Sequence, residues 1–591
     1  MIASAKSFRL ILIKPSHYDD DGYVIQWYRS WVPSNTLSVL YRLAQESVRR
    51  RALGEDVEIV LDAYDETNTV VPIKKIMKEI QGSGSGMVGI VGVQTNQFPR
   101  AVDIADHFVK ADIPVLIGGF HVSGCLAMLP EVPPDIQAAM DRGITMVAGE
   151  AEEKFDGLLQ DAYNRTLKPM YNFMDDLPDL GKAPYPFLPA HYHEKTAGRR
   201  SSFDAGRGCP FECSFCTIIN VQGRKSRWRS ADDIEALIRA NIEQGVRQFF
   251  ITDDDFARNR NWEPIIDRCI KLREEEGQHI SLLIQVDVLC HKIPRFIEKC
   301  ARAGVRTVFI GLENINPETL VNIKKRQNKI WEYRKMIQEW QSYGCMTIAG
   351  YILGFPNDTP ESLARDIEVI KNELPIDFLQ FNLLTPLPGS EDHKVLSEQG
   401  VWMDPDMNKY DIEHITTKHP KMTQEEWKKA YHDAWDRFYS LEHIETIHRR
   451  SAAFLTKDGR TPNEGKVFMH FLLYYGCFKV EGVHITQGGF FRRKIRTSRR
   501  SGLPIENPLL FYPRRLWEVV STNLQWIILA IKIRRIRLRV KKDPNRREYR
   551  DIAITPVVEQ EDEDFSLMTE YASHIPLSKI GKSKPVVEKV G

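Results

Sequence analysis

The sequence predicts an α/β protein in which two parallel-sheet units follow one another and a mostly helical region completes the chain. Three observations favour this class. The chain has 591 residues, too many for one ordinary domain. Short apolar runs alternate with helically spaced segments over residues 8–163. A second alternation of the same kind begins at residue 201 and ends near residue 415.

The first alternation predicts an open, doubly wound sheet within residues 1–165. The run "FRLILIK" is apolar with a polar end, as a buried parallel strand should be. Residues 34–52 have helical spacing, and helical stretches also separate the later strands. Those strands are expected at 57–62, 86–93, 113–119 and 143–149. Ligands of such sheets bind at the carboxyl ends of the strands, two of which are glycine-rich here.

The second alternation predicts six strand–helix units over residues 199–415, after a proline-containing linker at 166–198. The strands are expected in "SSFDAGRG", "VRQFFITDDD", "HISLLIQVDV", "VRTVFIGLEN", "CMTIAGYILGF" and "DFLQFNLLTPL". Parallel strands joined by right-handed crossovers close toward a barrel, here a partial one. Functional groups of such barrels gather at the carboxyl ends of the strands, where three cysteines, "TDDD", "GLEN" and "LGFPND" stand.

The remaining residues 416–558 are expected to form a basic, mostly helical region, and residues 559–591 a flexible tail. The net charge of +1 favours neither nucleic acid nor a membrane as a partner of the whole molecule. No signal-peptide pattern opens the chain, and no apolar stretch reaches the roughly 18 residues of a membrane span. We therefore expect a cytoplasmic protein with reduced thiols.

Three of the nine cysteines stand close together in "GRGCPFECSFC". Cys209, Cys213 and Cys216 have the spacing Cys-x3-Cys-x2-Cys in a loop after a strand. A structural zinc site usually has four ligands, and no fourth ligand stands at a matching spacing. A 4Fe–4S cluster bound by three cysteines keeps one iron open for a substrate or cofactor, so the trio favours iron–sulfur over zinc. Buried core thiols are expected at the other six positions, Cys125, Cys269, Cys290, Cys300, Cys345 and Cys477.

"CPFECSFC" resembles the cluster motif of radical S-adenosylmethionine (SAM) enzymes, with Phe215 at the aromatic position. "FITDDDF", "FIGLEN", "GYILGFPNDTPES" and "NLLTPLPGSE" resemble later strand ends of that family in the same order. The resemblance spans roughly residues 200–410 and implies a partial TIM-type barrel whose three cysteines bind a 4Fe–4S cluster. Contacts with SAM are implied for Phe215, Asp253, Gly311, Glu313 and Gly354.

Two of these residues also have a purely structural interpretation. Glu313 fits a strand-end carboxylate that caps the next helix. The run Asp253–Asp255 fits a metal site or, more readily within a barrel, a strand end held by hydrogen bonds.

The resemblance implies radical chemistry. In this family the open iron binds SAM, and an electron from the reduced cluster yields a 5′-deoxyadenosyl radical that takes hydrogen from an unactivated carbon. The cluster and SAM carry the difficult chemistry, and the protein positions them. A flavodoxin- or ferredoxin-type electron donor is implied as a partner.

The N-terminal unit resembles the Rossmann-like cobalamin-binding module that often precedes this barrel, through "VGVQT", "IGGFHVS" and "VAGEAEE". Cobalamin contacts are implied for Gly92, Thr95, Gly118, Gly119, Gly149 and Glu150. Many cobalamin proteins carry Asp-x-His-x-x-Gly, whose histidine binds cobalt, and His17, His107 and His121 do not fit that motif. The departure implies a cobalt without this ligand, and it leaves open a degenerate domain that binds nothing.

The fused pair implies cobalamin-dependent methyl transfer to an unactivated carbon of a small-molecule or lipid-like substrate. Relatives of this architecture also perform cyclisation or rearrangement, and the sequence does not separate these reactions. Methylthiotransferases are excluded because they carry a second cysteine trio in the N-terminal domain, where only Cys125 stands here. The intact trio also disfavours a non-enzymatic cobalamin sensor.

The basic C-terminal region offers the only clue to the substrate. Between Phe490 and Lys542 there are 15 Lys and Arg residues against two Glu. Arginines mixed with Trp517, Trp526 and isoleucines suit an anionic membrane surface, and would place the enzyme at the inner membrane face. Alternatively, the isoleucines cover the barrel and the arginines face water. Nucleic-acid modification ranks low, because no RNA-binding module appears.

Overall fold

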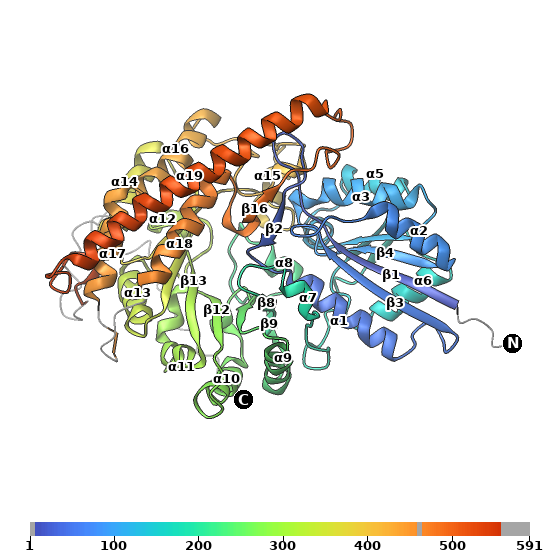
Figure 1. The fold of residues 1–591 in the computed structure, drawn as a ribbon, viewed down its shortest axis with the longest axis horizontal. Helices are drawn as coiled ribbons and strands as arrows, with labels where there is room; N and C mark the ends of the chain where they lie inside the picture. Colours follow the sequence, from blue (N-terminus) through green and yellow to red (C-terminus); the bar gives the residue numbers. More distant parts are fainter. Residues whose placement is uncertain (1–5, 455, 458–463, 557–591) are drawn as a thin grey trace.

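The computed structural model describes residues 6–454, 456–457 and 464–556, and it contains two parallel sheets that lie side by side (Figure 1). The first sheet and its helices form the blue and cyan part of Figure 1, and the second forms the green and yellow part. Helices from the C-terminal region lie over the second sheet (Figure 1). The predicted tail at 559–591 lies outside the described residues.

The N-terminal sheet has the order β3-β1-β4-β5-β6-β7, and all its strands are parallel. Its strands are β1 (Lys6–Lys14), β3 (Val57–Asp65), β4 (Gly86–Ile90), β5 (Val115–Gly118), β6 (Thr145–Ala148) and β7 (Met170–Asn172). The predicted doubly wound sheet is confirmed, but it has six strands where five were expected. β7 was missed because three residues at a sheet edge show no periodicity.

Alternate residues of β1 enter two separate cores, one on each face of this sheet. Phe8, Leu10 and Leu12 pack with side chains of α1 and α6, whereas Ile11 and Ile13 pack with those of the other helices. One face carries α1 (Asn35–Arg49) and α6 (Phe155–Tyr163). The other carries α2 (Ile73–Ser83), α3 (Phe98–Val109), α4 (Phe120–Met128) and α5 (Pro134–Asp141). Because both faces are covered, the inner strands β4 and β5 read as continuous apolar runs.

The second sheet has the order β15-β14-β13-β12-β11-β8 and is also parallel. Its strands are β8 (Arg200–Phe203), β11 (Gln248–Ile251), β12 (Ser281–Val286), β13 (Val305–Glu313), β14 (Met346–Leu353) and β15 (Phe378–Leu383). The crossover helices are α9 (Ala231–Glu243), α10 (Trp262–Glu274), α11 (Phe296–Ala303), α12 (Pro317–Asn322), α13 (Tyr333–Ser342) and α14 (Pro360–Glu373). This open sheet of six units confirms the predicted partial barrel.

C-terminal helices cover the edge strand β15 of this partial barrel. After α15 (Glu391–Glu398) come α16 (Gln424–Phe438), α17 (Leu441–Ala453) and α18 (Glu464–Gly476). Both α16 and α18 contact β15, and Trp427, Trp435 and Phe438 are buried in the barrel core. The long helix α19 (Pro508–Lys542) packs on α17 and α18. The cover removes an exposed strand edge, a recognised hazard for aggregation.

A short antiparallel pair joins the two ends of the chain. The strand β2 (Gln26–Ser30) pairs with β16 (Gly489–Arg493). Because β16 brings the C-terminal region onto the N-terminal domain, residues from both ends share the surfaces around it. The six cysteines outside the trio are all buried, as predicted.

Candidate active site

The three predicted cluster ligands lie in a loop between β9 (Gly206–Arg207) and α8 (Ile218–Val221). Cys213 is buried, and Cys209 and Cys216 are partly exposed. The Cys216 amide donates to the Cys213 carbonyl (3.1 Å), which tightens the turn. Gly208 has φ +88°, and a Cβ there would lie 2.5 Å from the carbonyl oxygen of Lys225, so only glycine fits.

The three thiols are close enough to influence one another. Burial, Asp254 and Cys213 together raise the pKa of Cys216 to about 12. Burial also raises the pKa of Cys209, and Asp255 and the other two cysteines add to the shift. Three thiolates in such a loop would repel one another unless a cationic centre bound them, so the donors fit an iron–sulfur cluster.

No group of three His, Cys, Asp or Glu side chains in the described parts of the chain is close enough for a single metal ion. A four-iron cluster separates its thiolate ligands more widely than one ion does.

Glu313, Lys325 and Phe215 come together beside the cysteine loop. The Lys325 ammonium is 2.7 Å from the Glu313 carboxylate and 5.8 Å from the centre of the Phe215 ring. A Cβ on Gly311 would lie 2.9 Å from Glu313 Oε1 and 3.0 Å from Lys325 Nζ, so glycine leaves space for the pair. Sequence reasoning missed Lys325, which lies in the loop after α12 and has no motif to mark it.

The alternative role for Glu313 as a helix cap is wrong. The cap of α12 is Asn316, whose side chain accepts from the amides of Glu318 and Thr319. Glu313 instead has φ +62° at the end of β13, a conformation that costs a non-glycine residue free energy. Such local strain is typical of functional positions.

Asp253 and Gly354 have structural roles in the described residues. Asp253 accepts from the amides of Ala205 (2.7 Å) and Gly206 (2.8 Å), and its burial raises its pKa to about 7. Gly354 has φ +105°, and a Cβ there would overlap the Trp427 ring at 1.9 Å. Asp253 therefore holds the end of β8 against β11, and Gly354 makes room for α16. A contact of either residue with SAM stays a prediction.

A narrow cavity of about 170 Å³ lies at the carboxyl ends of the N-terminal strands. Five of the six predicted cobalamin contacts line it: Gly92, Gly118, Gly119, Gly149 and Glu150. Apolar walls come from Val39, Leu116, Val147 and Phe155. The sequence therefore located this cavity from its glycine-rich strand ends.

The sixth predicted contact, Thr95, does not line this cavity. It is buried, and its hydroxyl is 3.4 Å from Nδ1 of His121. His121 Nε2 is 2.9 Å from the Asp135 carboxylate. Both ring nitrogens of His121 thus have neighbours, and no histidine lines the cavity within the described ranges.

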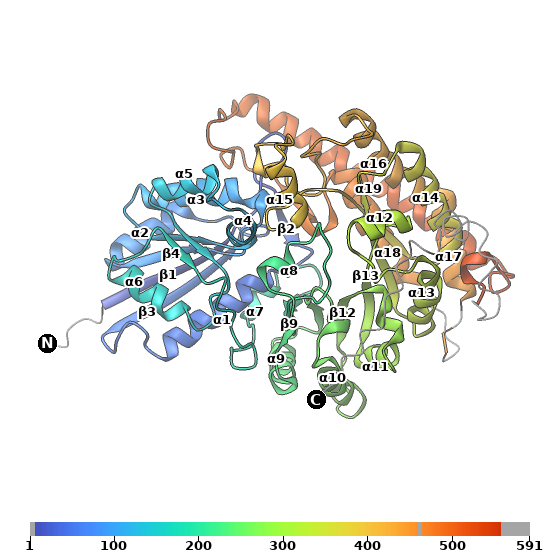
Figure 2. The same ribbon diagram turned by 180° about the vertical axis from the view of Figure 1, so that it is seen from behind.

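The cavity and the cysteine loop share a wall. Val221 and Gln222, at the end of α8, line the cavity. Helix α8 also contacts α4 of the N-terminal domain and lies between the two sheets (Figure 2). The helix that follows the cysteines therefore forms one side of the glycine-lined cavity.

A buried ionic network joins the two domains next to this cavity. Arg207 donates to Glu150 (2.5 Å), Glu152 (2.7 Å) and Asp204 (3.0 Å). Arg227 also binds Glu150. Arg229, 3.1 Å from Asp204, is fully buried, so the network has three carboxylates and three guanidinium groups. Apart from Glu150, sequence reasoning missed its members, because no local pattern pairs residues of separate domains.

The model of the radical SAM superfamily matches residues 205–370, which contain the cysteine loop and Glu313. The bacteriochlorophyllide d C-8(2)-methyltransferase of Chlorobaculum tepidum is 28% identical over 354 residues, which cover 56% of this chain and 73% of that protein. The chain is a radical SAM enzyme.

Two further comparisons bear on the architecture of this radical SAM enzyme. The hopanoid C-2 methylase of Rhodopseudomonas palustris is 26% identical, over 53% of this chain and 58% of that methylase. The fold matches that of the methyltransferase TsrM from Kitasatospora setae, solved with cobalamin and a [4Fe-4S] cluster, with a TM-score of 0.54 at 16% identity over 82% of this chain and 96% of that chain. The comparisons confirm the predicted family and fold class.

Proposed function

We propose that this radical SAM enzyme is a cobalamin-dependent methyltransferase acting on an unactivated carbon of a small-molecule or lipid-like substrate. The shared wall formed by α8 carries the proposal. α8 begins two residues after Cys216, and its last turn lines the glycine-rich cavity. Cofactors held by the loop and by the cavity would therefore face a common space, as consecutive reactions on one substrate require.

The residues of the barrel fit a cluster with bound SAM. Cys209, Cys213 and Cys216 would supply three thiolates to a cluster, and such a cluster would keep one iron open for SAM. Glu313 and Lys325 offer a carboxylate and an ammonium group beside this loop, which complement the amino and carboxylate groups of SAM. When bound, the cluster and SAM supply a radical that takes hydrogen from carbon, and cobalamin supplies the methyl group.

The glycine-lined cavity fits the aromatic tail of cobalamin. A cavity of about 150 Å³ with apolar walls accepts a benzene molecule. The cavity here has about 170 Å³ and mainly apolar walls, so a small flat ring system fits between Val39 and Val147. The paired Glu150 closes its polar end without leaving a free charge.

The test is anaerobic purification with added iron, sulfide and hydroxocobalamin, followed by incubation with a reductant and SAM carrying a deuterated methyl group. We expect cluster and cobalamin absorbance, release of 5′-deoxyadenosine and, with a substrate, a deuterated methyl group in the product. Material with zinc or without sulfide would refute the proposal, and a product without added mass would refute methyl transfer.

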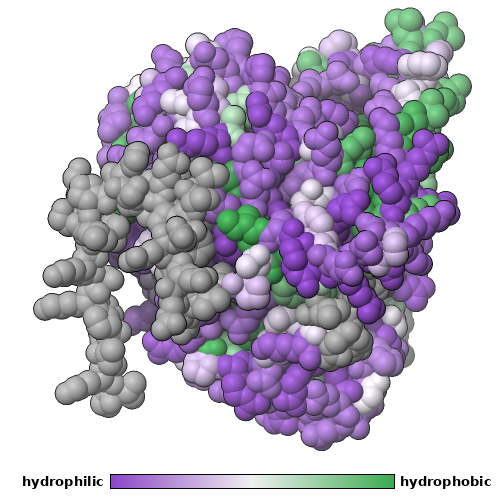
Figure 3. All heavy atoms as spheres, turned by 90° about the vertical axis from the view of Figure 1, so that its left-hand side faces the viewer, coloured by the Kyte–Doolittle hydropathy of each residue, from purple (hydrophilic) through white to green (hydrophobic). Residues whose placement is uncertain are grey.

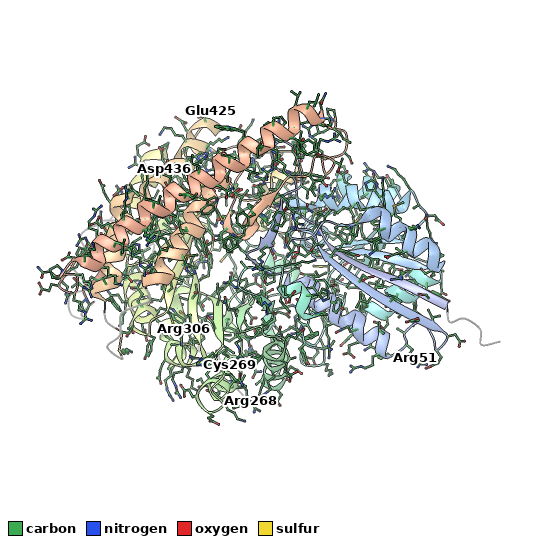
Figure 4. The ribbon with its side chains drawn as sticks, viewed as in Figure 1. Arg51, Arg268, Cys269, Arg306, Glu425 and Asp436 are labelled. Atoms are coloured by element: carbon green, nitrogen blue, oxygen red, sulfur yellow. The ribbon has the colours of Figure 1, made fainter. Side chains whose placement is uncertain are left out.

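Cys213→Ala should abolish 5′-deoxyadenosine formation and leave cobalamin binding intact. The matched control is Cys269→Ala on α10, labelled in Figure 4, which removes an equally buried thiol far from the loop in sequence. Cys269→Ala should retain SAM cleavage. Equal loss in both variants would show that the cysteines matter only for packing.

We also propose that α19 lies on an anionic membrane surface. One face of α19 is apolar and exposed along Leu509, Leu510, Tyr512, Leu516, Trp517, Val520, Leu524, Ile527, Ile528 and Ile531. The opposite face packs on the protein through Phe511, Leu529, Ile533, Ile536 and Val540. Hydrophobic side chains gather along the upper right edge in Figure 3. Basic residues fill the last third of the helix.

By length and composition, α19 is the one helix in the described ranges that could cross a membrane, and 11% of its most apolar stretch is buried. Because its other face already packs on α17 and α18, we propose that it lies along the surface of the inner face rather than across the bilayer. Flotation with anionic vesicles tests this contact. Leu516→Ser should weaken flotation, and no flotation of the wild type at moderate salt would refute the contact.

An external electron donor of the flavodoxin or ferredoxin type would complete the reaction. A small donor that reduces the cluster would support 5′-deoxyadenosine release in place of a chemical reductant. Without the donor, turnover should stop while SAM still binds. This result would show that the donor supplies electrons and does not help the enzyme to bind SAM.

A further inference from the structure

Two large cavities adjoin each other at β16, and residues of this strand line both of them. The polar one, about 840 Å³ and here called the vestibule, begins where two strands end, with His17 after β1 and Leu383 at the end of β15. Its outer wall is α16, where Glu425 and Asp436 mark two positions in Figure 4. The vestibule therefore opens at the carboxyl edge of both sheets, the edge that also carries the cysteine loop.

The second cavity, here called the groove, has about 1100 Å³ and mostly apolar walls. It lies between α18, β16 and α19, and its walls include Trp31, Leu472, Phe490, Trp526 and Ile527. The rings of Trp31 and Phe490 are 4.2 Å apart. The groove thus offers continuous apolar surface next to the proposed membrane face of α19.

The vestibule and the groove meet at three shared residues. Glu481, Arg492 and Lys494 line both cavities. All three have partners: Trp526 donates to Glu481 (2.9 Å), Arg492 to Asp19 (2.8 Å) and Lys494 to Asp21 (2.8 Å). Both cations are paired with carboxylates, whereas Glu481 accepts only from a neutral indole, so the boundary offers no unpaired cation for an anionic headgroup.

Polar groups of the vestibule wall lack partners within the described residues. These are the hydroxyl of Tyr431, Oε1 of Glu413 and Oε1 of Gln487. Tyr431 is only 2% exposed, so bulk water does not satisfy its hydroxyl. Leaving such groups unpaired destabilises a protein, and a bound ligand that supplies donors removes the penalty.

The buried free groups of the vestibule wall favour a ligand with hydroxyls over a charged one. Two of them accept hydrogen bonds, and the Tyr431 hydroxyl both donates and accepts. Asp411, beside Glu413, already has His414 at 2.9 Å. Burial and Asp411 raise the pKa of Glu413, which disfavours its charged form. An uncharged headgroup with several hydroxyls meets these groups without desolvating an ion.

We propose that the groove and the vestibule together bind one amphiphile, with its apolar chain in the groove and an uncharged, hydroxyl-bearing headgroup in the vestibule. The inference deepens the proposed function by naming its substrate class. Only the role of the bound amphiphile as a substrate depends on that function. Binding itself depends on neither the cluster nor cobalamin.

The probe is n-dodecyl-β-D-maltoside below its critical micelle concentration, titrated into the full chain by isothermal calorimetry without reductant. We expect saturable binding of one molecule. Maltose alone should not bind, because it lacks the chain, and dodecyl phosphate should bind more weakly, because it brings a charge. Equal binding of maltose, or tighter binding of dodecyl phosphate, would overturn the proposal.

Three variants locate the site. Ala530→Trp fills the groove and should weaken binding roughly tenfold or more, since each excluded methylene costs about fourfold. Tyr431→Phe removes one hydroxyl and should weaken binding about threefold to tenfold. Leu441→Ser, at an exposed position at the start of α17 outside both cavities, should bind the maltoside like the wild type.

Circular dichroism checks folding, and Thr522→Trp, on the same groove wall, replaces Ala530→Trp if that variant is unfolded. Unchanged binding in a folded groove-filling variant would refute the site. An enzyme that binds the maltoside but cleaves no SAM would refute the proposed function alone. An enzyme that methylates a water-soluble substrate and ignores the maltoside would refute this inference alone.

Discussion

Arg207→Met should weaken the contact between the two domains and lower the free energy of unfolding. Its guanidinium contacts three buried carboxylates, two on the N-terminal domain and one after β8. In the variant Glu150 keeps Arg227, but Glu152 keeps no ion-pair partner among the described residues. Leaving one buried charge unpaired costs about 3–5 kcal/mol, so we expect the free energy of unfolding to fall by about that amount.

The loss should depend on pH. Burial alone would raise the pKa of Glu152, but Arg207 outweighs it and lowers the pKa, so in the wild type Glu152 stabilises the fold above its ordinary titration range and loses this effect as the pH falls. Without Arg207 the burial raises the pKa instead, and stability is lost as the pH rises. The difference between wild type and variant should therefore widen from pH 5 to pH 8.

Urea unfolding followed by circular dichroism at both pH values measures this difference. The matched control is Arg239→Met, which removes an exposed arginine paired with Glu235 and Glu276. Exposed pairs contribute less than about 1 kcal/mol, so the control should barely change stability. A loss for Arg207→Met no larger than that of the control, or one independent of pH, would refute the reasoning.

Three further outcomes follow from the site and its surroundings. Gly354→Ala should lower the free energy of unfolding by about 2–4 kcal/mol in thermal denaturation, because its Cβ would overlap Trp427; Gly400→Ala, which also has positive φ but open space, should cost less. Glu313→Gln should weaken SAM binding roughly tenfold in equilibrium dialysis without changing the iron content. Burial lowers the pKa of His414, but Asp20 and Asp411 outweigh burial and raise the pKa to about 10. The protonated ring therefore stabilises the wild-type fold below about pH 6.5, and this contribution is lost as the pH rises to about 10. His414→Gln lacks the contribution, so the stability of the variant should not fall over this range.

Much of the fold could be read from local patterns. Every residue of β14 is buried, and apart from Thr347 its sequence is apolar or aromatic, as expected for a strand covered on both faces. The cysteine spacing and the aromatic position at Phe215 marked the cluster loop because all its donors lie within one short segment. The glycine-rich strand ends likewise located the narrow cavity.

Two features of the site depend on contacts that the sequence does not show. Thr95 is predicted to contact cobalamin, and in the structure the turn after β4 places its hydroxyl beside His121. Lys325 was not predicted, because its ion pair with Glu313, twelve residues earlier, is not marked by any sequence motif. In both cases the decisive contact is between side chains, which sequence spacing does not report.

The sequence alone determined the two parallel units, their order and the grouping of the three thiols predicted to bind a cluster, since periodicity and ligand spacing are local properties of the chain. Only the tertiary structure decided which distant residues meet. The pairing of β2 with β16, the network around Arg207 and the adjoining vestibule and groove all join segments far apart in the chain. Burial and complementary charge select such contacts, and they act only once the chain has packed.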